Sequence, residues 1–220
     1  MGVMVKEVKG RHYDNAGRQT QSEETRQRIV EAARHLMVER GYRATTIADV
    51  ARRAGVHVDT VYALIGRKPV LLRELIEQAI SGTDGAVSAQ ERGYVKAIQS
   101  ASDPVRKLTI YAEATRRIQA RMAPLLLALR DASATEPEAK QVWREISDRR
   151  AANMRELVQD LDAVGGLRAG LSIDEAADII WATNSSELYV LLTVERGWPP
   201  DRYELWLAEA WCRLLLPDTR

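Results

Sequence analysis

The sequence predicts an all-α protein in which a small N-terminal helical head is joined by a connector helix to a larger helical body. Two observations predict this fold class. Apolar residues recur at the i, i+3, i+4, i+7 spacing of amphipathic helices, first within residues 29–37, and no stretch of residues 83–220 alternates as a half-buried strand does. Expected helix ends are also marked by capping and stop residues, such as Asp103-Pro104 and Gly165-Gly166.

Composition and length narrow the class of protein. Of the 220 residues 45% are hydrophobic, which is enough for a sizeable core. No apolar run is long enough to span a bilayer and no signal peptide is evident, so we expect a cytoplasmic protein without a membrane partner. The single cysteine, Cys212, excludes an internal disulfide and a cysteine-rich metal site. No phosphate-loop, metal or nucleophile motif is present, so the sequence predicts no metal, no cofactor and no enzyme activity.

The N-terminal region divides into an arm and a helix. Residues 1–20 contain three glycines and scattered charge, which predicts a flexible arm. Ser22 is a suitable N-cap for the amphipathic helix that follows, which carries acidic residues in its first turn and ends at Gly41. We expect this helix to support the next segment from behind.

Residues 41–72 have the pattern of a helix-turn-helix. A short helix is expected at Ile47–Ala54, because Thr46 and Asp49 form a reciprocal capping pattern before it and Gly55 ends it. A second helix is expected at Val58–Leu64, and the short interval lets the two helices cross steeply. Its outward side chains are small enough to lie against base edges in the major groove of DNA. These outward residues are His57, Val58, Thr60 and Ala63.

One run in this segment, read without a gap, is Gly41-Tyr42, Thr45-Thr46-Ile47, Val50-Ala51, Ala54-Gly55-Val56, Val61-Tyr62 and Lys68. At this spacing the run resembles the DNA-binding signature of the TetR family of bacterial transcriptional regulators. The resemblance implies that Thr45 or Thr46, together with Tyr62 and Lys68, contacts DNA phosphates. The positions that depart from the family pattern are His57, where Ser or Thr usually caps the helix, and Leu64, Ile65 and Pro69.

The rest of the chain is read as a connector and a body. A connector helix is expected from Lys68 to Ile80, and the glycine-containing residues 81–93 place a boundary near residue 82. The expected domains are therefore the arm (1–20), the DNA-binding head with its connector (21–82) and the body (83–220). The helices expected in the body are Pro104 to a break at Pro124, Leu125–Arg130, 136–164, 172–196 with a capping box at Ser172, and 201–216.

The body is interpreted as a ligand sensor. Its long helices mix bulky apolar residues with a few polar ones, as a largely apolar pocket requires. Asn184 and Ser185 interrupt an apolar face, so a ligand, a water or a partner subunit is expected to satisfy them. Packing in an ordinary core is the competing interpretation for each residue. The candidate ligand-binding residues are Tyr111, Ile118, Met122, Trp143, Met154, Trp181, Asn184, Ser185 and Tyr189.

The last two helices of the body carry an apolar stripe that is too broad for one neighbouring surface. The resemblance implies a homodimer in which two such helix pairs meet at a two-fold axis, and packing within one chain is the alternative. The candidate interface residues are Leu188, Leu191, Tyr203, Trp206, Leu207, Ala210, Trp211 and Leu214.

The expected function is a dimeric DNA-binding transcriptional regulator. The leading hypothesis is a repressor that a small, largely apolar effector releases from an inverted repeat in double-stranded DNA. One alternative is a DNA-binding regulator without a small-molecule effector, switched by a protein partner. A helical-bundle enzyme with an incidental helix-turn-helix is the remaining alternative.

Overall fold

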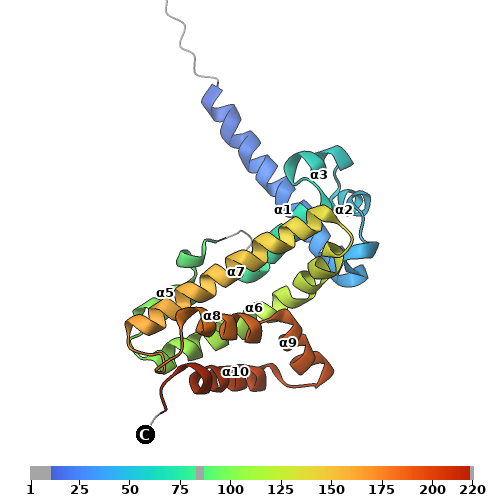
Figure 1. Ribbon diagram of the computed structural model, residues 1–220. Helices are drawn as coiled ribbons and strands as arrows, with labels where there is room; N and C mark the ends of the chain where they lie inside the picture. Colours follow the sequence, from blue (N-terminus) through green and yellow to red (C-terminus); the bar gives the residue numbers. More distant parts are fainter. Residues whose placement is uncertain (1–10, 83–86, 219–220) are drawn as a thin grey trace, which may run out of the picture. The chain divides into compact units, whose positions relative to one another are not determined.

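The computed structural model describes residues 11–82 and 87–218, and within these residues every regular element is a helix, which confirms the all-α prediction (Figure 1). The chain forms two compact units, one ending at Leu71 and the other beginning at Leu72. The division falls inside helix α4 (Lys68–Ser81), the expected connector. The domain boundary that we predict near residue 82 lies at the C-terminal end of that helix.

The first unit contains a helix-turn-helix with the predicted bounds. Its elements are α1 (Arg11–Ala44), α2 (Ile47–Ala54), α3 (Val58–Leu64) and the start of α4.

Helix α1 begins earlier than the sequence pattern predicts. We expected it to start after Ser22, but residues 11–20 are already helical, while residues 1–10 of the expected arm lie outside the described residues. Residues 11–20 have no apolar stripe, so periodicity did not reveal them. Extending an existing helix costs far less than nucleating one, and polar residues can therefore continue a packed helix. Gly41 interrupts the helix as predicted, with φ 79° and ψ 165°.

Helix α2 is held at both ends by the predicted caps. The Thr46 hydroxyl oxygen accepts a hydrogen bond from the Asp49 backbone N–H at 3.1 Å, and the Asp49 carboxylate accepts one from the Thr46 backbone N–H at 3.2 Å. The Thr46 hydroxyl also donates to the Asp49 carboxylate at 2.6 Å, and this bond and the one from the Thr46 backbone N–H lower the pKa of the Asp49 carboxyl. Gly55 ends the helix in the left-handed region, at φ 67°. Helix α2 is therefore bounded by a reciprocal cap at its start and by a glycine at its end.

The core of the first unit lies between α1, α2 and α3. The apolar stripe predicted for α1 is buried, and α3 contributes the fully buried Val61. Val56, just before α3, and Leu64, the last residue of that helix, are only half-buried. The buried residues shared by the three helices are Ile29, Ala32, Ala33, Leu36, Met37, Val50, Ala51, Ala54 and Val61.

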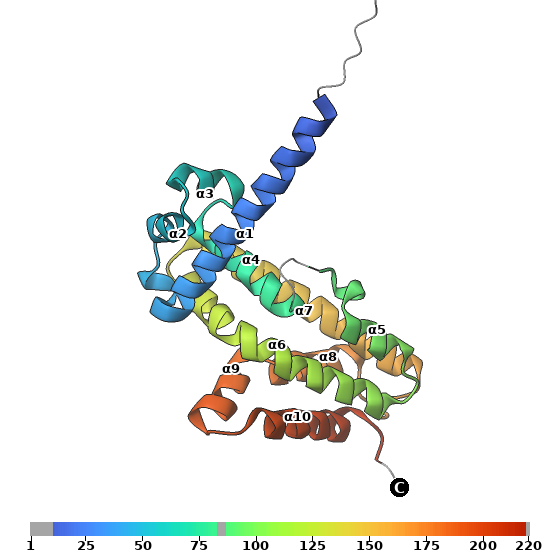
Figure 2. The ribbon, with the colours of Figure 1, turned by 180° about the vertical axis from the view of Figure 1, so that it is seen from behind.

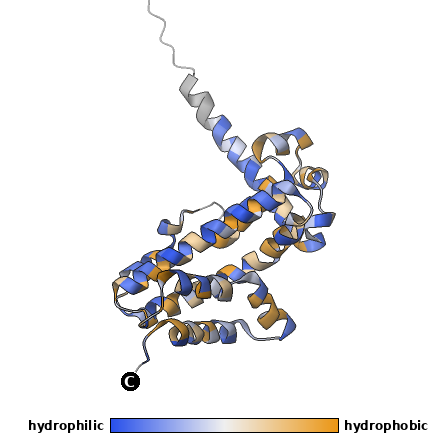
Figure 3. Ribbon diagram, in the orientation of Figure 1, coloured by the Kyte–Doolittle hydropathy of each residue, from blue (hydrophilic) through white to orange (hydrophobic). Residues whose placement is uncertain are grey.

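The second unit is a helical bundle around α6. Its elements are η1 (Ala89–Glu91), α5 (Gly93–Ser100), α6 (Pro104–Ser133), α7 (Pro137–Ala163), α8 (Ile173–Thr183), α9 (Ser186–Val190), the π-helical η2 (Leu191–Glu195) and α10 (Pro200–Leu215). Helix α6 packs against α5, α7, α9 and α10, while α7 also packs against α8 (Figure 2). Figure 3 shows hydrophilic and hydrophobic residues mixed along α7, whose apolar side chains Val142, Ile146 and Val158 are buried. The bundle therefore has one core, with α6 at its centre.

The predicted break at Pro124 is wrong, because α6 continues through it to Ser133. Proline removes one backbone N–H and disfavours a helix interior. Here the residues on both sides of it, Ala123 and Leu125, are buried, as are Leu126 and Leu129 of the following turn. Packing of these side chains outweighs the lost hydrogen bond, since most helical stability in proteins comes from tertiary contacts.

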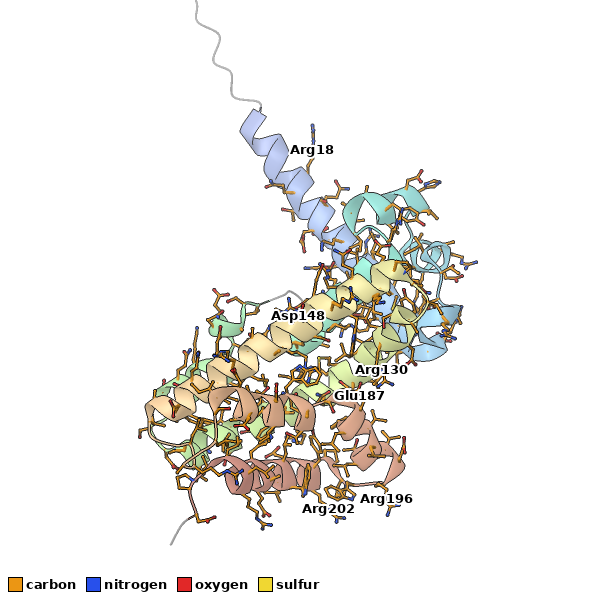
Figure 4. All side chains as sticks on the ribbon, viewed as in Figure 1. Arg18, Arg130, Asp148, Glu187, Arg196 and Arg202 are labelled. Atoms are coloured by element: carbon orange, nitrogen blue, oxygen red, sulfur yellow. The ribbon has the colours of Figure 1, made fainter. Side chains whose placement is uncertain are left out.

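The helix predicted from 172 to 196 is also wrong, because it is divided after Thr183. Asn184 ends α8, and Ser185 starts α9 by accepting a hydrogen bond from the Leu188 backbone N–H at 3.3 Å. Short polar side chains favour caps over helix interiors. In Figure 4, Arg130 of α6 lies beside Glu187 of α9, and their side chains form an ion pair at 2.6 Å. The break therefore gives α9 its own attachment to α6.

None of the helices in the described parts of the chain is both long and apolar enough to cross a membrane.

Candidate nucleic-acid interface and ligand cavity

Helix α3 presents a mixed face of small and polar side chains. Val61 is fully buried and fixes the helix against its unit. His57 and Ala63 are exposed, Val58 and Thr60 are half-buried, and Tyr62 is 50% exposed. The structure therefore brings the residues predicted to meet base edges onto the accessible part of one short helix, beside the tyrosine predicted to contact a phosphate.

His57 performs the capping role that Ser or Thr was expected to fill. Its Nδ1 accepts a hydrogen bond from the Asp59 backbone N–H at 3.4 Å, and the backbone at His57 is extended. The distance is long for an N–H acceptor pair, so the cap is weaker than a hydroxyl cap of ordinary length. His57 is thus both the N-cap of α3 and an exposed side chain at the start of that helix.

The two candidate threonines have different environments. Thr45 is 1% exposed, and its hydroxyl donates a hydrogen bond to the Gly41 carbonyl at 2.9 Å. Thr46 is exposed at the N-terminus of α2. Of the two side chains, only that of Thr46 is open to a DNA phosphate, because the Thr45 side chain is part of the core.

Lys68 opens α4 and lies over an aromatic ring. Its Nζ is 3.9 Å from the ring centroid of Tyr42, and that tyrosine is buried. A cation over the face of a tyrosine ring is attracted to it. The ammonium group of Lys68 is therefore held at the start of α4 by a contact within the first unit.

The second unit encloses a cavity of about 130 Å³. Five of the predicted ligand-binding residues lie in its wall: Tyr111, Ile118, Met122, Met154 and Asn184. Sequence reasoning missed other wall residues on α5, α6 and α7, among them Tyr94, Ile98, Thr115, Gln119, Arg150 and Leu157. The wall is thus mainly apolar, with a polar group of residues where α6, α7 and the α8–α9 break meet.

The other four predicted residues have structural roles outside the cavity wall. Ser185 caps α9, and Tyr189 is buried with its ring edge-on to Tyr203, at 5.1 Å between centroids. Trp143 is half-buried on α7. Trp181 is half-buried on α8 beneath the guanidinium of Arg150, 5.2 Å from the ring centroid. None of these four residues lines the cavity.

Asn184 has its hydrogen bonds satisfied within the chain. Its amide N–H donates to the Tyr111 hydroxyl at 2.8 Å, and its side-chain oxygen accepts from Arg150 at 2.6 Å. Its backbone carbonyl accepts from the Gln119 side chain. Burial raises the pKa of Tyr111, which keeps the phenol protonated. The partner expected for Asn184 is therefore neither a ligand nor another subunit but the neighbouring side chains of α6 and α7.

Arg150 is the most informative residue that the sequence did not reveal. It lies among polar residues of α7, a pattern typical of a solvated helix face, yet burial lowers the pKa of its guanidinium. Its hydrogen bonds go to two neutral oxygens, those of the Asn184 side chain and, at 3.2 Å, the Trp181 carbonyl. Among the described residues no carboxylate forms an ion pair with Arg150.

The predicted dimer residues divide into an inner and an outer set. Tyr203, Leu207 and Trp211 are fully buried, so this part of the predicted interface is the core of the chain itself. The outer set remains accessible. Leu191 and Leu214 are 46% and 39% exposed, and Leu188, Trp206 and Ala210 are half-buried. One side of the broad stripe therefore packs into the bundle interior, and the other side is accessible in the single chain.

Within the two described stretches, no group of three or more His, Cys, Asp or Glu side chains is arranged to hold a metal ion.

Residues 29–75 match the family model described as bacterial regulatory proteins, tetR family. A curated relative, the uncharacterized HTH-type transcriptional regulator YvkB of Bacillus subtilis (strain 168), is 36% identical over 69 residues. That match covers 31% of this chain and 36% of the relative, so it spans about a third of the relative's length. The match to the family model covers the second half of α1, the helix-turn-helix and the start of α4.

Solved structures resemble nearly the whole chain in fold. NalD from Pseudomonas aeruginosa, the secondary repressor of the MexAB-OprM multidrug efflux pump, is 24% identical with a TM-score of 0.69, covering 91% of this chain and all of that one. A putative regulator from Saccharomonospora viridis in complex with choline has 21% identity and a TM-score of 0.68, covering 89% and 100%. FadR from Bacillus subtilis in complex with stearoyl-CoA has 19% identity and a TM-score of 0.68, covering 84% and 96%.

Proposed function

We propose that this chain is a dimeric repressor of the tetR family of bacterial regulatory proteins, whose model its residues 29–75 match, and that it leaves its operator when an effector enters the body. The observation that carries the proposal is the pairing of an accessible recognition helix with a separate, mainly apolar cavity. The DNA target is an inverted repeat, because a two-fold symmetric dimer reads two equivalent half-sites.

We assign two kinds of DNA contact to the first unit. Thr46, Tyr62 and Lys68 contact phosphates and fix the position of α3 on the duplex. Contacts to base edges come from the exposed face of α3, where the methyl groups of Val58 and Thr60 are suited to the methyl group of thymine. His57 and Ala63 complete this face. The exposure of Tyr62 and the half-exposure of Val58 and Thr60 support the division.

We expect Tyr62→Phe and Lys68→Ala each to weaken DNA binding about equally on all sequences and to reduce its salt dependence, because phosphate contacts carry no base information. Val58→Ala is the matched comparison, and it should alter the preferred base at one or two positions of each half-site by about 1–3 kcal/mol. The measurement is a titration of operator and scrambled DNA at several salt concentrations. DNA from beside the gene supplies the operator.

Lys68→Ala also removes the contact with Tyr42, which is worth about 0.5–1 kcal/mol at an exposed site. A thermal melt therefore accompanies each titration, so that lost folding is separated from lost phosphate contact. A variant that binds as tightly as the parent but prefers another sequence would exclude the phosphate role for the residue changed.

The homodimer is proposed to form through the outer stripe of α9 and α10. Trp206, Ala210 and Leu214 are spaced four residues apart, so they follow one side of α10. Leu188 and Leu191 extend the apolar surface on α9 and at the start of η2. Exposed apolar side chains that continue one another along neighbouring helices are typical of a subunit interface.

The cavity is proposed as the effector site, with α4 as the element that carries the response. Ile80 of α4 lies in the cavity wall. Arg149, also in the wall, forms an ion pair with Glu77 of α4. An effector that displaces α7 or α5 therefore acts directly on α4, the helix that begins in the first unit. A shift in the position of α4 alters the spacing of the two recognition helices in the dimer. The dimer then loses its contacts with one of the two half-sites.

Coupling between effector binding and operator binding must act equally in both directions, and this reciprocity can be tested. If an effector lowers operator affinity by about 5- to 150-fold, operator DNA must lower effector affinity by the same factor. Calorimetric titration of the effector into the protein, with and without bound operator, measures both sides of this relation. Equal effector affinities in the two titrations would contradict effector control, while loss of DNA binding by the parent protein would contradict the regulator itself.

A further inference from the structure

The cavity wall contains both an apolar region and an unpaired positive charge. We propose that the cavity binds an amphipathic anion, an apolar body carrying a carboxylate-like acid group, with the acid group held by Arg150. This inference rests on the proposed function, since it names the chemical class of the effector. The two ligands in the similar solved structures, choline and stearoyl-CoA, carry opposite charges and therefore do not indicate the charge of the effector. The residues of the cavity wall in this chain do indicate it.

The charged groups of the wall are unevenly compensated. Arg149 is neutralised by Glu77, and Asp160 is neutralised by Lys107, whose Nζ lies 2.6 Å from the Asp160 carboxylate. Arg150 keeps its positive charge without a carboxylate partner among the described residues.

Two further charged side chains, Arg92 and Glu156, lie in the wall outside these pairs. Arg92 donates two hydrogen bonds to the Val87 carbonyl, at 3.2 and 3.1 Å, and Glu156 is exposed. The less accessible part of the wall therefore has a positive excess, which favours an anionic occupant.

The hydrogen bonds of Arg150 in this structure go to neutral acceptors, which bind a guanidinium less strongly than a carboxylate does. Its guanidinium has five N–H donors, and the acceptors it has found are the amide oxygen of Asn184 and the backbone oxygen of Trp181. Bonds to neutral oxygens are weaker than bonds to a carboxylate, which the planar guanidinium can bind through two parallel contacts. Burial lowers the pKa of Arg150, and the Glu187 carboxylate, which forms its ion pair with Arg130 instead, offsets this effect only in part.

The donors beside Arg150 extend the acid-binding end. Thr115, Gln119 and Tyr111 lie in the same wall, and Tyr111 stays protonated because burial raises its pKa. The Tyr111 hydroxyl donates to the Met154 sulfur at 3.1 Å and the Gln119 amide donates to the Asn184 carbonyl, and a ligand oxygen would be a stronger acceptor than the sulfur. Apolar residues form most of the remaining surface, which suits a hydrocarbon or aromatic body. They include Ile98, Ile118, Met122, Ile146 and Leu157.

The volume of the cavity limits the ligand used to test the proposal. About 130 Å³ is less than the roughly 300–1,000 Å³ of pockets for drug-sized ligands. The probes are therefore compact and differ only in the charge of the head: hexanoate, hexanamide and hexylamine, which is protonated at neutral pH. Hexanamide matches the shape of the carboxylate without its charge, so the comparison isolates the ionic contribution.

We expect hexanoate to bind the full-length protein about 10- to 100-fold more tightly than hexanamide, the scale of a hydrogen bond to a charged group, and hexylamine to bind most weakly. Binding is measured by calorimetry and by tryptophan fluorescence, since Trp181 contacts Arg150 and Trp211 stacks on Tyr111. Arg150→Met, which keeps much of the side-chain length without the charge, should abolish the preference for hexanoate over hexanamide.

Arg155→Met is the matched control. Arg155 lies on the same helix, is exposed, pairs with Asp174 and does not line the cavity, so the preference should persist. A thermal melt checks that each variant is folded, and the three probes on the unaltered protein test the charge preference even if Arg150→Met does not fold.

The possible outcomes of the probe titrations exclude different parts of the proposal. Equal binding of the three probes, or tighter binding of hexylamine, overturns the anion proposal and leaves an effector cavity in place. Persistence of the hexanoate preference in Arg150→Met overturns the role of Arg150. Failure of all three probes to bind the unaltered protein overturns both this inference and the proposed effector site.

Discussion

A chain carrying Ala210→Glu and Leu214→Glu should sediment as a monomer of 24.7 kDa, whereas the unaltered protein should sediment at twice that mass. The two residues lie one turn apart on α10, and both are at least partly accessible in the single chain. Two glutamates on this stripe would place like charges opposite one another in the subunit interface and leave them without water.

Loss of the dimer should also remove most of the operator affinity. Linked binding to two half-sites gains about 10²- to 10⁴-fold over either site alone, and a monomer forfeits that gain. The matched control is Leu205→Glu. Leu205 is 65% exposed and nine residues from Leu214, which at about 100° per residue puts it on the opposite side of α10. A dimer that survives the double change but dissociates in the control would place the interface on the opposite side of the helix.

The second large effect is expected from Asp160→Ala, which should lower the free energy of unfolding by about 3 kcal/mol, because it leaves the charge of Lys107 buried without its carboxylate. Lys107 is 1% exposed, and its other hydrogen bond goes to the Ile98 carbonyl at 2.8 Å. We place the effect at the lower end for a broken buried pair because the Asp160 side chain is 32% exposed. Urea unfolding at fixed protein concentration measures the loss.

Lys107→Met should destabilise the protein much less, by about 1 kcal/mol or less, because it removes the buried charge together with its need for a partner. Asp160 then remains as a carboxylate with access to water. The asymmetry between the two variants is the test. Equal losses would mean that the pair contributes through its packing, and a larger loss for Lys107→Met would mean that the aspartate depends on the lysine.

The first unit could be predicted closely from the sequence because its signals are local. The capping pair Thr46 and Asp49, the stop at Gly55 and the short spacing to α3 each act within a few residues, and the observed bounds of α2 and α3 agree with them. Pro124 had the same kind of signal, but burial of the residues around it decided the outcome. Local chemistry predicts an element well when no long-range packing opposes it.

The cavity was only partly predictable for the same reason. Bulky apolar residues such as Ile118 and Met122 were found by their helical spacing. Arg150 was missed because its position on α7 matches a solvated face, and only the fold reveals that α8 covers it. Asn184 was recognised as unusual, but its partners Tyr111 and Gln119 lie more than sixty residues away along the chain. Contacts at such separations have no signature in one sequence.

The break between α8 and α9 limits how the effector specificity of this protein can be redesigned. Asn184 ends one helix, and its amide also orients Arg150 and Tyr111 in the cavity wall. A biosensor built from this scaffold therefore cannot exchange Asn184 for a new ligand contact without also changing where a helix ends. Ile118 and Met122 line the cavity but lie within α6, away from its ends. A mutant library aimed at new effectors should therefore vary those two positions and keep Asn184 constant.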